Sequence, residues 1–251
     1  MIVWLSSFPR SGNTLTRIML HRIFGIASTS EYMPERPDYA ADAAAGAPGS
    51  AAALGRGRRI AKLVADGAYY PYRGSFAEFV AEARLSPERV FIKSHAAPRD
   101  DEPAIYIVRD GRAAVVSLFH YLAARNEPRT MRDVIAGDGT EAASWSGHLA
   151  AWQPLTRPNT LLLHFEGLVA KPDSAIAALS HFLGIAPGAA WHNHQAEVAA
   201  VDGAFFLGGS NARNLSELTA SDEALFWSLH GSWMRRLGYE RSAAIGAAAP
   251  N

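Results

Sequence analysis

The sequence of 251 residues contains no cysteine, which excludes a disulfide, a zinc site with thiolate ligands and a cysteine nucleophile. It also lacks an excess of charge of one sign, because 24 basic residues balance 24 acidic ones and the formal net charge is zero. A neutral chain has no broad electrostatic attraction to nucleic acid or to an acidic membrane. We therefore expect no nucleic-acid partner, and any basic binding cleft has to be local.

Long hydrophobic runs are missing as well. The apolar run at residues 2–5 is far too short for the core of a signal peptide, and no basic segment precedes it. No other run approaches the length of a membrane span. Hydrophobic residues still make up 49% of the chain, enough for a sizeable core without disulfide or metal support. We expect a cytoplasmic protein without a membrane span.

Short apolar segments alternate with helical patterns along the chain. We expect four strands, at residues 2–6, 90–92, 104–108 and 160–165. Helical patterns follow the first, third and fourth of these, and residues 131–153 and 217–237 also look helical. Such alternation is typical of a parallel sheet covered by helices on both faces. The sequence predicts a three-layer α/β fold similar to that of P-loop proteins, in one domain covering residues 1–251.

Two segments differ from the rest in composition. Residues 40–59 are rich in alanine and glycine, and we interpret residues 40–62 as a mobile loop or lid. The basic end of this segment is more typical of a solvated surface than of a binding patch. Residues 242–251 are expected to form a disordered tail.

Polar clusters follow three of the expected strands. They are Pro-Arg-Ser-Gly-Asn-Thr at residues 9–14, Lys-Ser-His at residues 93–95 and Arg-Asp at residues 109–110. In open α/β sheets, ligands bind beyond the carboxyl ends of the strands. Although each cluster alone is a weak indication, their common position predicts one site.

The first cluster stands where a P-loop would bind phosphate, but the Walker lysine is missing. Alignment to G-x-x-x-x-G-K-[ST] puts Ser7, Gly12, Asn13 and Thr14 at the motif positions. Gly12 still allows the backbone to approach an anion, and the amides of the helix start favour negative charge. Arg10 supplies a cation three residues before the lysine position. The structural alternative is a turn in which serine or asparagine caps the helix.

The other two clusters carry side chains suited to proton transfer and to phosphate binding. On an extended segment, Lys93 and His95 share a face. A histidine with a pKa of about 6.5 suits general-base catalysis at neutral pH, although a lone histidine is more often a surface loop residue. Arg109 ends a strand, and Ser117 lies in the helix that follows. Arginine is suited to bidentate phosphate contacts, and an ordinary ion pair with Asp110 or another neighbour is the alternative.

A metal site has little support in the sequence. His192 and His194 could share a face, but no third ligand occurs at a useful spacing. We therefore expect no bound metal.

In this order, the clusters resemble the sulfotransferases that use 3′-phosphoadenosine 5′-phosphosulfate (PAPS). "SSFPRSGNTL" is similar to the 5′-phosphosulfate loop of that family, "FIKSHAAP" to its catalytic histidine segment and "YIVRDGRAAVVSLFHY" to its 3′-phosphate segment. "LLLHFEGLVAKPDSAIAALSHFLG" and "LTASDEALFWSLHGSWMRRLGYE" resemble the family's Tyr-Glu-Asp segment and closing helix. Together these segments span residues 2–240.

The resemblance implies a sulfotransferase of the EC 2.8.2 type. Such an enzyme would move a sulfuryl group from PAPS to a hydroxyl or amine of a small-molecule, carbohydrate or lipid acceptor. The other product would be adenosine 3′,5′-bisphosphate (PAP), and no metal would take part. The oligomeric state stays open, with a homodimer as one option.

The resemblance also implies individual roles. His95 would be the general base, and Lys93 would help to stabilise the transferring sulfuryl group. Arg10 would lie near the bridging oxygen, where the family usually has a lysine. Arg109 and Ser117 would hold the 3′-phosphate, and Phe165 would stack beside the adenine. The residues implied in nucleotide binding are Arg10, Ser11, Gly12, Asn13, Thr14, Leu15, Arg109, Ser117, Phe165 and Arg213.

Two departures from the family pattern affect the nucleotide site. Leu15 replaces the tryptophan that usually covers the adenine. The family's Arg-Lys-Gly clamp for the 3′-phosphate corresponds to Gly208, Gly209 and Ser210, so two cations are missing. Arg213 is the nearest replacement, with a solvent-facing arginine as the alternative.

Two other functional classes remain as alternatives. A P-loop kinase or nucleotide hydrolase would need a lysine at the Asn13 position and a metal-binding aspartate after a strand, for which Asp110 is the candidate. A non-catalytic nucleotide-binding protein would not require His95. Trp145, His148, Trp152 and Phe119 either line the acceptor pocket or belong to the core.

Overall fold

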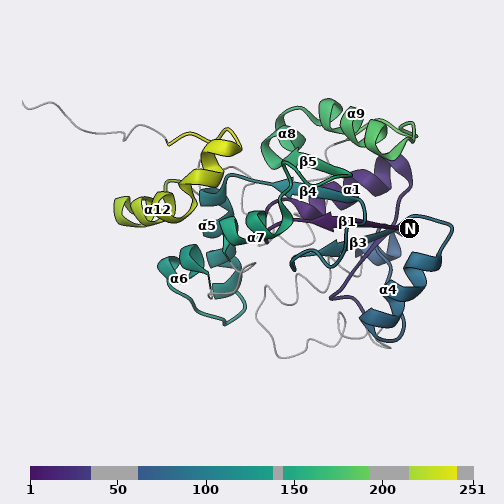
Figure 1. Ribbon diagram of the computed structural model, residues 1–251, viewed down its shortest axis with the longest axis horizontal. Coiled ribbons are helices and arrows are strands. Elements are labelled where there is room, and N and C mark those ends of the chain that lie inside the picture. The colour runs from purple at the N-terminus through teal and green to yellow at the C-terminus, as the bar shows by residue number, and fades with distance from the viewer. Residues whose placement is uncertain (35–61, 138–143, 193–214, 242–251) are drawn as a thin grey trace, which may run out of the picture.

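The fold is built on a parallel sheet of five strands. The computed structural model describes residues 1–34, 62–137, 144–192 and 215–241. The strands are β1 (Ile2–Ser6), β2 (Ser28–Ser30), β3 (Val90–Ser94), β4 (Ala104–Val108) and β5 (Thr160–His164). Their order in the sheet is β2-β3-β1-β4-β5. Figure 1 shows β3, β1, β4 and β5 side by side in this order. Strand β1 is therefore central, and the chain leaves its carboxyl end between the ends of β3 and β4.

Alternate side chains of the strands point to opposite faces, and both faces are covered. Trp4 and Tyr106 belong to one buried cluster, whereas Leu5 and Ile105 belong to the other. This is why β1 and β4 read as continuous apolar runs: every residue in them is buried.

Three helices cover the face that contains Leu5. They are α1 (Asn13–Phe24), α8 (Phe165–Ala170) and α9 (Pro172–Leu183). Their apolar stripes, with Met19 in α1 and Leu179 in α9 fully buried, complete this half of the core.

The opposite face carries a larger set of helices. They are α4 (Phe76–Leu85), α5 (Gly111–Ala123), α6 (Met131–Ala136), α7 (Trp145–Trp152) and α12 (Ala220–Arg236). Packing at Gly111 is tight, because an added Cβ would lie 2.6 Å from Phe226 of α12 and 2.6 Å from Trp145 of α7. Trp145, His148 and Trp152 are buried, so they belong to the core, whereas Phe119 is only partly buried against it.

The three-layer α/β architecture is confirmed, and the differences from the sequence prediction are local. Strand β2 was not predicted, because its three residues are polar. The pattern at residues 131–153 contains two helices, since Gly137 ends α6 with a positive φ of 79°. Strand β5 stops at His164, and Phe165 begins a helix. The tail at residues 242–251, and the lid segment except Lys62, lie outside the described residues.

No helix within the described ranges is long and apolar enough to cross a membrane.

Candidate active site

The turn between β1 and α1 forms the centre of the site. Arg10 and Gly12 have positive φ angles of 68° and 104°, which bend the chain sharply before α1 begins at Asn13. Gly12 is the N-cap, and no side chain among the described residues makes a capping hydrogen bond to α1. The capping alternative is therefore wrong for the described turn, and the first amides of α1 are oriented as in an anion-binding turn.

The side chain of Asn13 points inward rather than toward a ligand. Its Nδ2 donates to the carbonyl oxygen of Leu5 at 2.8 Å and lies 3.4 Å from Oγ of Ser7. Asn13 thus ties the turn to the end of β1, and only its backbone N–H can serve an anion. Oγ of Ser11 and Oδ1 of Asn13 are buried without a hydrogen-bond partner in the described part of the chain. Such atoms are costly unless a partner satisfies them.

His95 is held against the same turn. Its Nδ1 lies 2.6 Å from the carbonyl oxygen of Ser7. A carbonyl only accepts, so Nδ1 must carry the proton and Nε2 keeps its lone pair. Burial lowers the pKa of His95 well below 6.5, the charge of Lys93 lowers it further, and the Ser7 carbonyl opposes this only in part. The ring is therefore neutral at pH 7, as a proton acceptor has to be.

Lys93 lies at the end of β3, close enough for its charge to act on His95. Its Nζ is 4.6 Å from the centre of the Tyr32 ring, within the range of a cation–π contact. The end of β3 therefore carries a neutral imidazole and an ammonium group within electrostatic range of each other.

Two arginines lie at the turn, Arg10 within it and Arg109 directly after β4. Nε of Arg10 donates to Oγ of Ser117 in α5 at 3.2 Å, and its guanidinium lies 5.2 Å from the centre of the Tyr121 ring. Nη1 of Arg109 donates to the backbone oxygen of Arg10 at 3.1 Å. Arg109 is buried, and burial lowers its pKa although the charges of Glu166 and Asp110 oppose this. Both cations are thus placed at the same turn.

Phe165 covers the turn from the other side. The ring lies so close to Gly12 that an added Cβ there would be 2.5 Å from Cδ2 of Phe165. The guanidinium of Arg109 lies 4.6 Å from the centre of the same ring. The aromatic face that the sequence predicted beside the nucleotide is therefore in contact with the phosphate-loop candidate.

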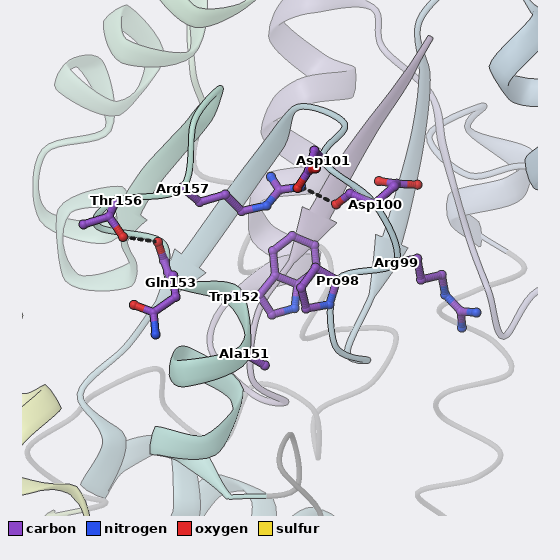
Figure 2. A pocket seen from close by; sticks show the side chains of 9 residues that line it. All are labelled: Pro98, Arg99, Asp100, Asp101, Ala151, Trp152, Gln153, Thr156 and Arg157. Carbon is purple, nitrogen blue, oxygen red and sulfur yellow. Dashed lines mark hydrogen bonds between the residues drawn. The ribbon is translucent and has the colours of Figure 1, made fainter.

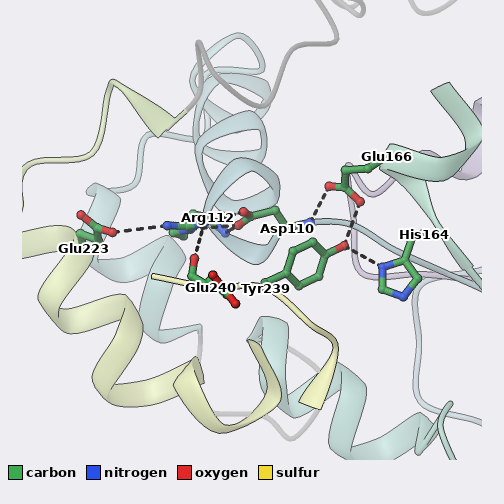
Figure 3. Close-up of polar contacts among 7 residues, drawn as sticks. All are labelled: Asp110, Arg112, His164, Glu166, Glu223, Tyr239 and Glu240. Atoms are coloured by element: carbon green, nitrogen blue, oxygen red, sulfur yellow. Dashed lines mark hydrogen bonds and ion pairs between the residues drawn. The ribbon is translucent and has the colours of Figure 1, made fainter. Parts of the chain in front are cut away.

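A polar network fastens the far end of the chain to this region (Figure 3). The carboxylate of Glu166 accepts from the backbone N–H of Asp110 at 3.0 Å and from the hydroxyl of Tyr239 at 2.9 Å. That hydroxyl also lies 3.2 Å from Nδ1 of His164. Tyr239 was not predicted, because nothing in its local sequence marks a partner 73 residues away.

The carboxylate of Asp110 pairs with Arg112 and caps helix α5. It accepts from Nε of Arg112 at 3.1 Å and from Nη2 at 2.8 Å, and it caps α5 through the backbone N–H of Arg112 at 2.9 Å. A metal-binding aspartate, which the kinase alternative requires, would have to leave these donors.

A pocket lies beside the loop that joins β3 to β4 (Figure 2). Its walls are formed by Pro98, Arg99, Asp100, Asp101, Ala151, Trp152, Gln153, Thr156 and Arg157. Trp152, a candidate for the acceptor pocket, is among them, whereas none of the predicted catalytic or nucleotide-binding residues is. Nη2 of Arg157 donates to the backbone oxygens of Asp100 and Glu102 at 2.7 and 2.9 Å, so this cluster holds the loop in place.

The structure thus brings most of the predicted residues together. Thr14 and Leu15 lie in the first turn of α1 and are partly buried. Arg213 and His194 lie outside the described residues, and His192 is exposed. Within the described ranges, no three histidine, aspartate or glutamate side chains gather in a way that could hold a metal ion.

Comparison with solved structures identifies relatives of the fold. Mouse sulfotransferase SULT7A1, solved in complex with PAP, is similar with a TM-score of 0.59 and 18% identity over 93% of this chain and 83% of that one. A retinol dehydratase, solved with androsterone and PAP, has a TM-score of 0.48 and 16% identity over 97% of this chain and 82% of that one. A search of curated protein sequences finds no match.

The sequence itself matches the family described as the sulfotransferase domain over residues 2–198. This match covers most of the chain and includes every candidate site residue except Arg213. The protein belongs to the sulfotransferase domain family. It is a transferase of the sulfotransferase class.

Proposed function

We propose that the protein transfers the sulfuryl group of PAPS to a hydroxyl or amine of an acceptor, with His95 as general base. The observation that carries the proposal is the turn at residues 7–12. Within this one turn, Ser7 contacts His95, Arg10 contacts Ser117, and the backbone oxygen of Arg10 contacts Arg109. A base and two cations therefore meet at an uncapped helix start, as sulfuryl transfer from a nucleotide requires.

The donor set fits a nucleotide with a 5′-phosphosulfate. The first amides of α1 and the buried, unpartnered Oγ of Ser11 can bind the 5′-phosphate. Thr14 adds a hydroxyl in the same turn. Gly12 leaves room for the Phe165 ring, which would stack beside the adenine near Leu15. PAP bound to the mouse relative supports the same class of donor for this chain.

The 3′-phosphate would be held by Arg109 and Ser117, and we retain Arg213 as a third contact. The guanidinium of Arg109 is already fixed by its bond to the backbone oxygen of Arg10. A fixed arginine loses less conformational freedom when it binds a phosphate than a mobile one does. Ser117 accepts from Arg10, so its hydroxyl proton can be donated to a phosphate oxygen.

In the reaction, the acceptor oxygen or nitrogen attacks sulfur, and its bond to sulfur forms while the bond from sulfur to the bridging oxygen breaks. The acceptor's proton moves to Nε2 of His95, whose lone pair faces away from Ser7. The bridging oxygen leaves as part of PAP and gains negative charge. Lys93 and Arg10 stabilise that charge, which is the role that cations have in the related phosphoryl transfers.

The test uses PAPS and a metabolite extract. After incubation with the wild-type protein, mass spectrometry should find extract components heavier by one sulfuryl group. With the product known, His95→Ala should lower the rate of transfer by about a hundredfold or more while the affinity for PAP changes little. Normal turnover of His95→Ala would show that another group accepts the proton.

We also propose that residues 1–251 form a single domain. The central sheet is assembled from strands between residues 2 and 164, and helix α12, from the other end of the described chain, packs on α5, α6 and α7. Removal of α12 should therefore unfold the protein rather than leave an active core.

A further inference from the structure

Two residues that follow β2 contact the strand end that carries Lys93 and His95. Strands β2 and β3 are parallel neighbours, with Ser30 opposite Lys93. The backbone N–H of Glu31 continues this pairing by donating to the oxygen of Lys93 at 3.4 Å. Glu31 and Tyr32 therefore lie beside the proposed catalytic pair, although the sequence assigned neither of them a role.

The carboxylate of Glu31 holds the backbone turn from which His95 projects. Its Oε1 accepts from Oγ of Ser94 at 3.1 Å and from the backbone N–H of His95 at 3.3 Å. Its Oε2 accepts from Nη2 of Arg99 at 3.1 Å. The Glu31 side chain is only 8% exposed, so these donors have to replace most of its water.

Glu31 is itself fixed, and so is the far side of the turn. The hydroxyl of Tyr72 donates to the backbone oxygen of Glu31 at 3.0 Å. On the opposite side, Nε1 of Trp152 donates to the backbone oxygen of Ala96 at 2.8 Å. Hydrogen bonds therefore anchor the chain on both sides of His95, at Ser94 and at Ala96, as well as the N–H of His95 itself. The imidazole ring can then move only by rotation about its side-chain bonds.

Tyr32 acts on the other member of the pair. The centre of its ring lies 4.6 Å from Nζ of Lys93, and the side chain is 60% exposed toward solvent. A ring face in this position favours one location of a long ammonium side chain.

We propose that Glu31 and Tyr32 are positioning residues, Glu31 for His95 and Tyr32 for Lys93. This inference rests on the proposed function, since it assumes that these two side chains act on the transferring group. Reacting groups that are misplaced by about 1 Å can lose roughly a hundredfold in rate, so backbone anchoring of a base is a substantial contribution to catalysis.

The central test compares Glu31→Ala with Glu31→Gln. Glu31→Ala removes the acceptor for Ser94 and His95, and kcat should fall by about tenfold to a hundredfold. Glu31→Gln keeps an oxygen acceptor and should retain kcat within about threefold of the wild type. Arg99→Ala, which removes only the half-exposed partner, is the matched control and should leave kcat within about twofold.

The affinity for PAP separates positioning from general damage. In Glu31→Ala, the Kd for PAP measured by calorimetry should stay within about twofold of the wild-type value. Unchanged kcat in Glu31→Ala would overturn the proposal. A fall in kcat accompanied by an equal loss of PAP affinity would also overturn it, because the whole site would then be affected.

A measurement that needs no acceptor substrate can test the positioning of His95 even if the proposed function is wrong. Nitrogen NMR of protein labelled at histidine reports whether Nδ1 of His95 carries the proton and is bonded, with His95→Asn identifying the signal. In Glu31→Ala the His95 signal should shift toward that of a ring exchanging between both tautomers. An unchanged signal would refute positioning by Glu31, even if no acceptor is found.

For Lys93, the informative pair is Tyr32→Phe and Tyr32→Ala. Phenylalanine keeps the ring face and removes only the hydroxyl. The bond of that hydroxyl to Glu31 is one of several on the carboxylate, so kcat should stay close to the wild-type value. Alanine removes it, and kcat should fall by about twofold to fivefold, as expected for loss of an exposed cation–π contact. Equal rates for the two variants would show that the ring does not position Lys93.

Discussion

Gly12→Ala should be far more damaging than an alanine at another glycine of the same helix. Gly12 has a φ of 104°, and an added Cβ would lie 2.5 Å from Cδ2 of Phe165. The positive φ alone should cost about 1–2 kcal/mol with alanine. Pushing the Phe165 ring aside adds an overpacking cost of about 1–3 kcal/mol. The free energy of unfolding should therefore fall by roughly 2–5 kcal/mol, which urea denaturation can measure.

Gly25→Ala is the matched control, because it also places alanine at a positive φ but creates no steric overlap. Gly25 ends α1 with a φ of 68°, and nothing lies within 4 Å of an added Cβ. The difference between the two variants thus isolates the overlap with Phe165. If Gly12→Ala is no more destabilising than Gly25→Ala, the close packing of Phe165 on the turn is refuted.

The same substitution should weaken nucleotide binding. In the proposed mode of binding, a displaced Phe165 ring would no longer stack beside the adenine, and an alanine at residue 12 would hold the backbone away from the 5′-phosphate. The Kd for PAP should rise by tenfold or more in Gly12→Ala, and it should change little in Gly25→Ala. Equal PAP affinities in the two variants would show that Phe165 does not contribute to nucleotide binding.

The remaining predictions concern pH, charge and the C-terminal network. Burial lowers the pKa of His148 to about 3. Between pH 6.5 and 3, the histidine is therefore protonated in the unfolded chain and neutral in the native protein, and this difference favours unfolding. Stability should therefore decrease by about 2 kcal/mol between pH 6.5 and 5, and His148→Gln should lack this part of the decrease in urea titrations at both pH values. Arg10→Ala should reduce turnover more than affinity for PAP, and Arg10→Lys should retain activity, as rate and calorimetry will show. Tyr239→Phe removes the hydroxyl bonded to Glu166 and should lower the free energy of unfolding by about 1 kcal/mol in urea denaturation.

The sequence predicted those parts of the fold that have a strong local pattern. The apolar runs of β1 and β4 and the stripe of α1 match the structure closely, because burial on both faces leaves few polar residues in a strand. Strand β2 has no such pattern, since Ser28–Ser30 is short and polar and exists through its pairing with β3. No rule based on local composition identifies a strand of this kind.

The candidate site followed from the position of polar residues at strand ends, which topology brings together. What the sequence did not supply is the direction of each side chain. Asn13 points toward Leu5 rather than a ligand, and Asp110 binds Arg112. Glu31 was missed because its partners are 63 and 64 residues away and no motif marks it. Contacts of this kind depend on how the chain packs, not on its local pattern.

The central claim is that the turn at residues 7–12, together with Arg109 and Ser117, binds a nucleotide that carries a 3′-phosphate. Titration calorimetry of the wild-type protein with PAP and with adenosine 5′-monophosphate tests it most directly. A charge-assisted hydrogen bond contributes about 1.5–3 kcal/mol, so PAP should bind at least about tenfold more tightly, and Arg109→Ala should remove most of that preference. Equal affinity for the two nucleotides would contradict the account, because the 3′-phosphate would then not be recognised and PAPS could not be the donor.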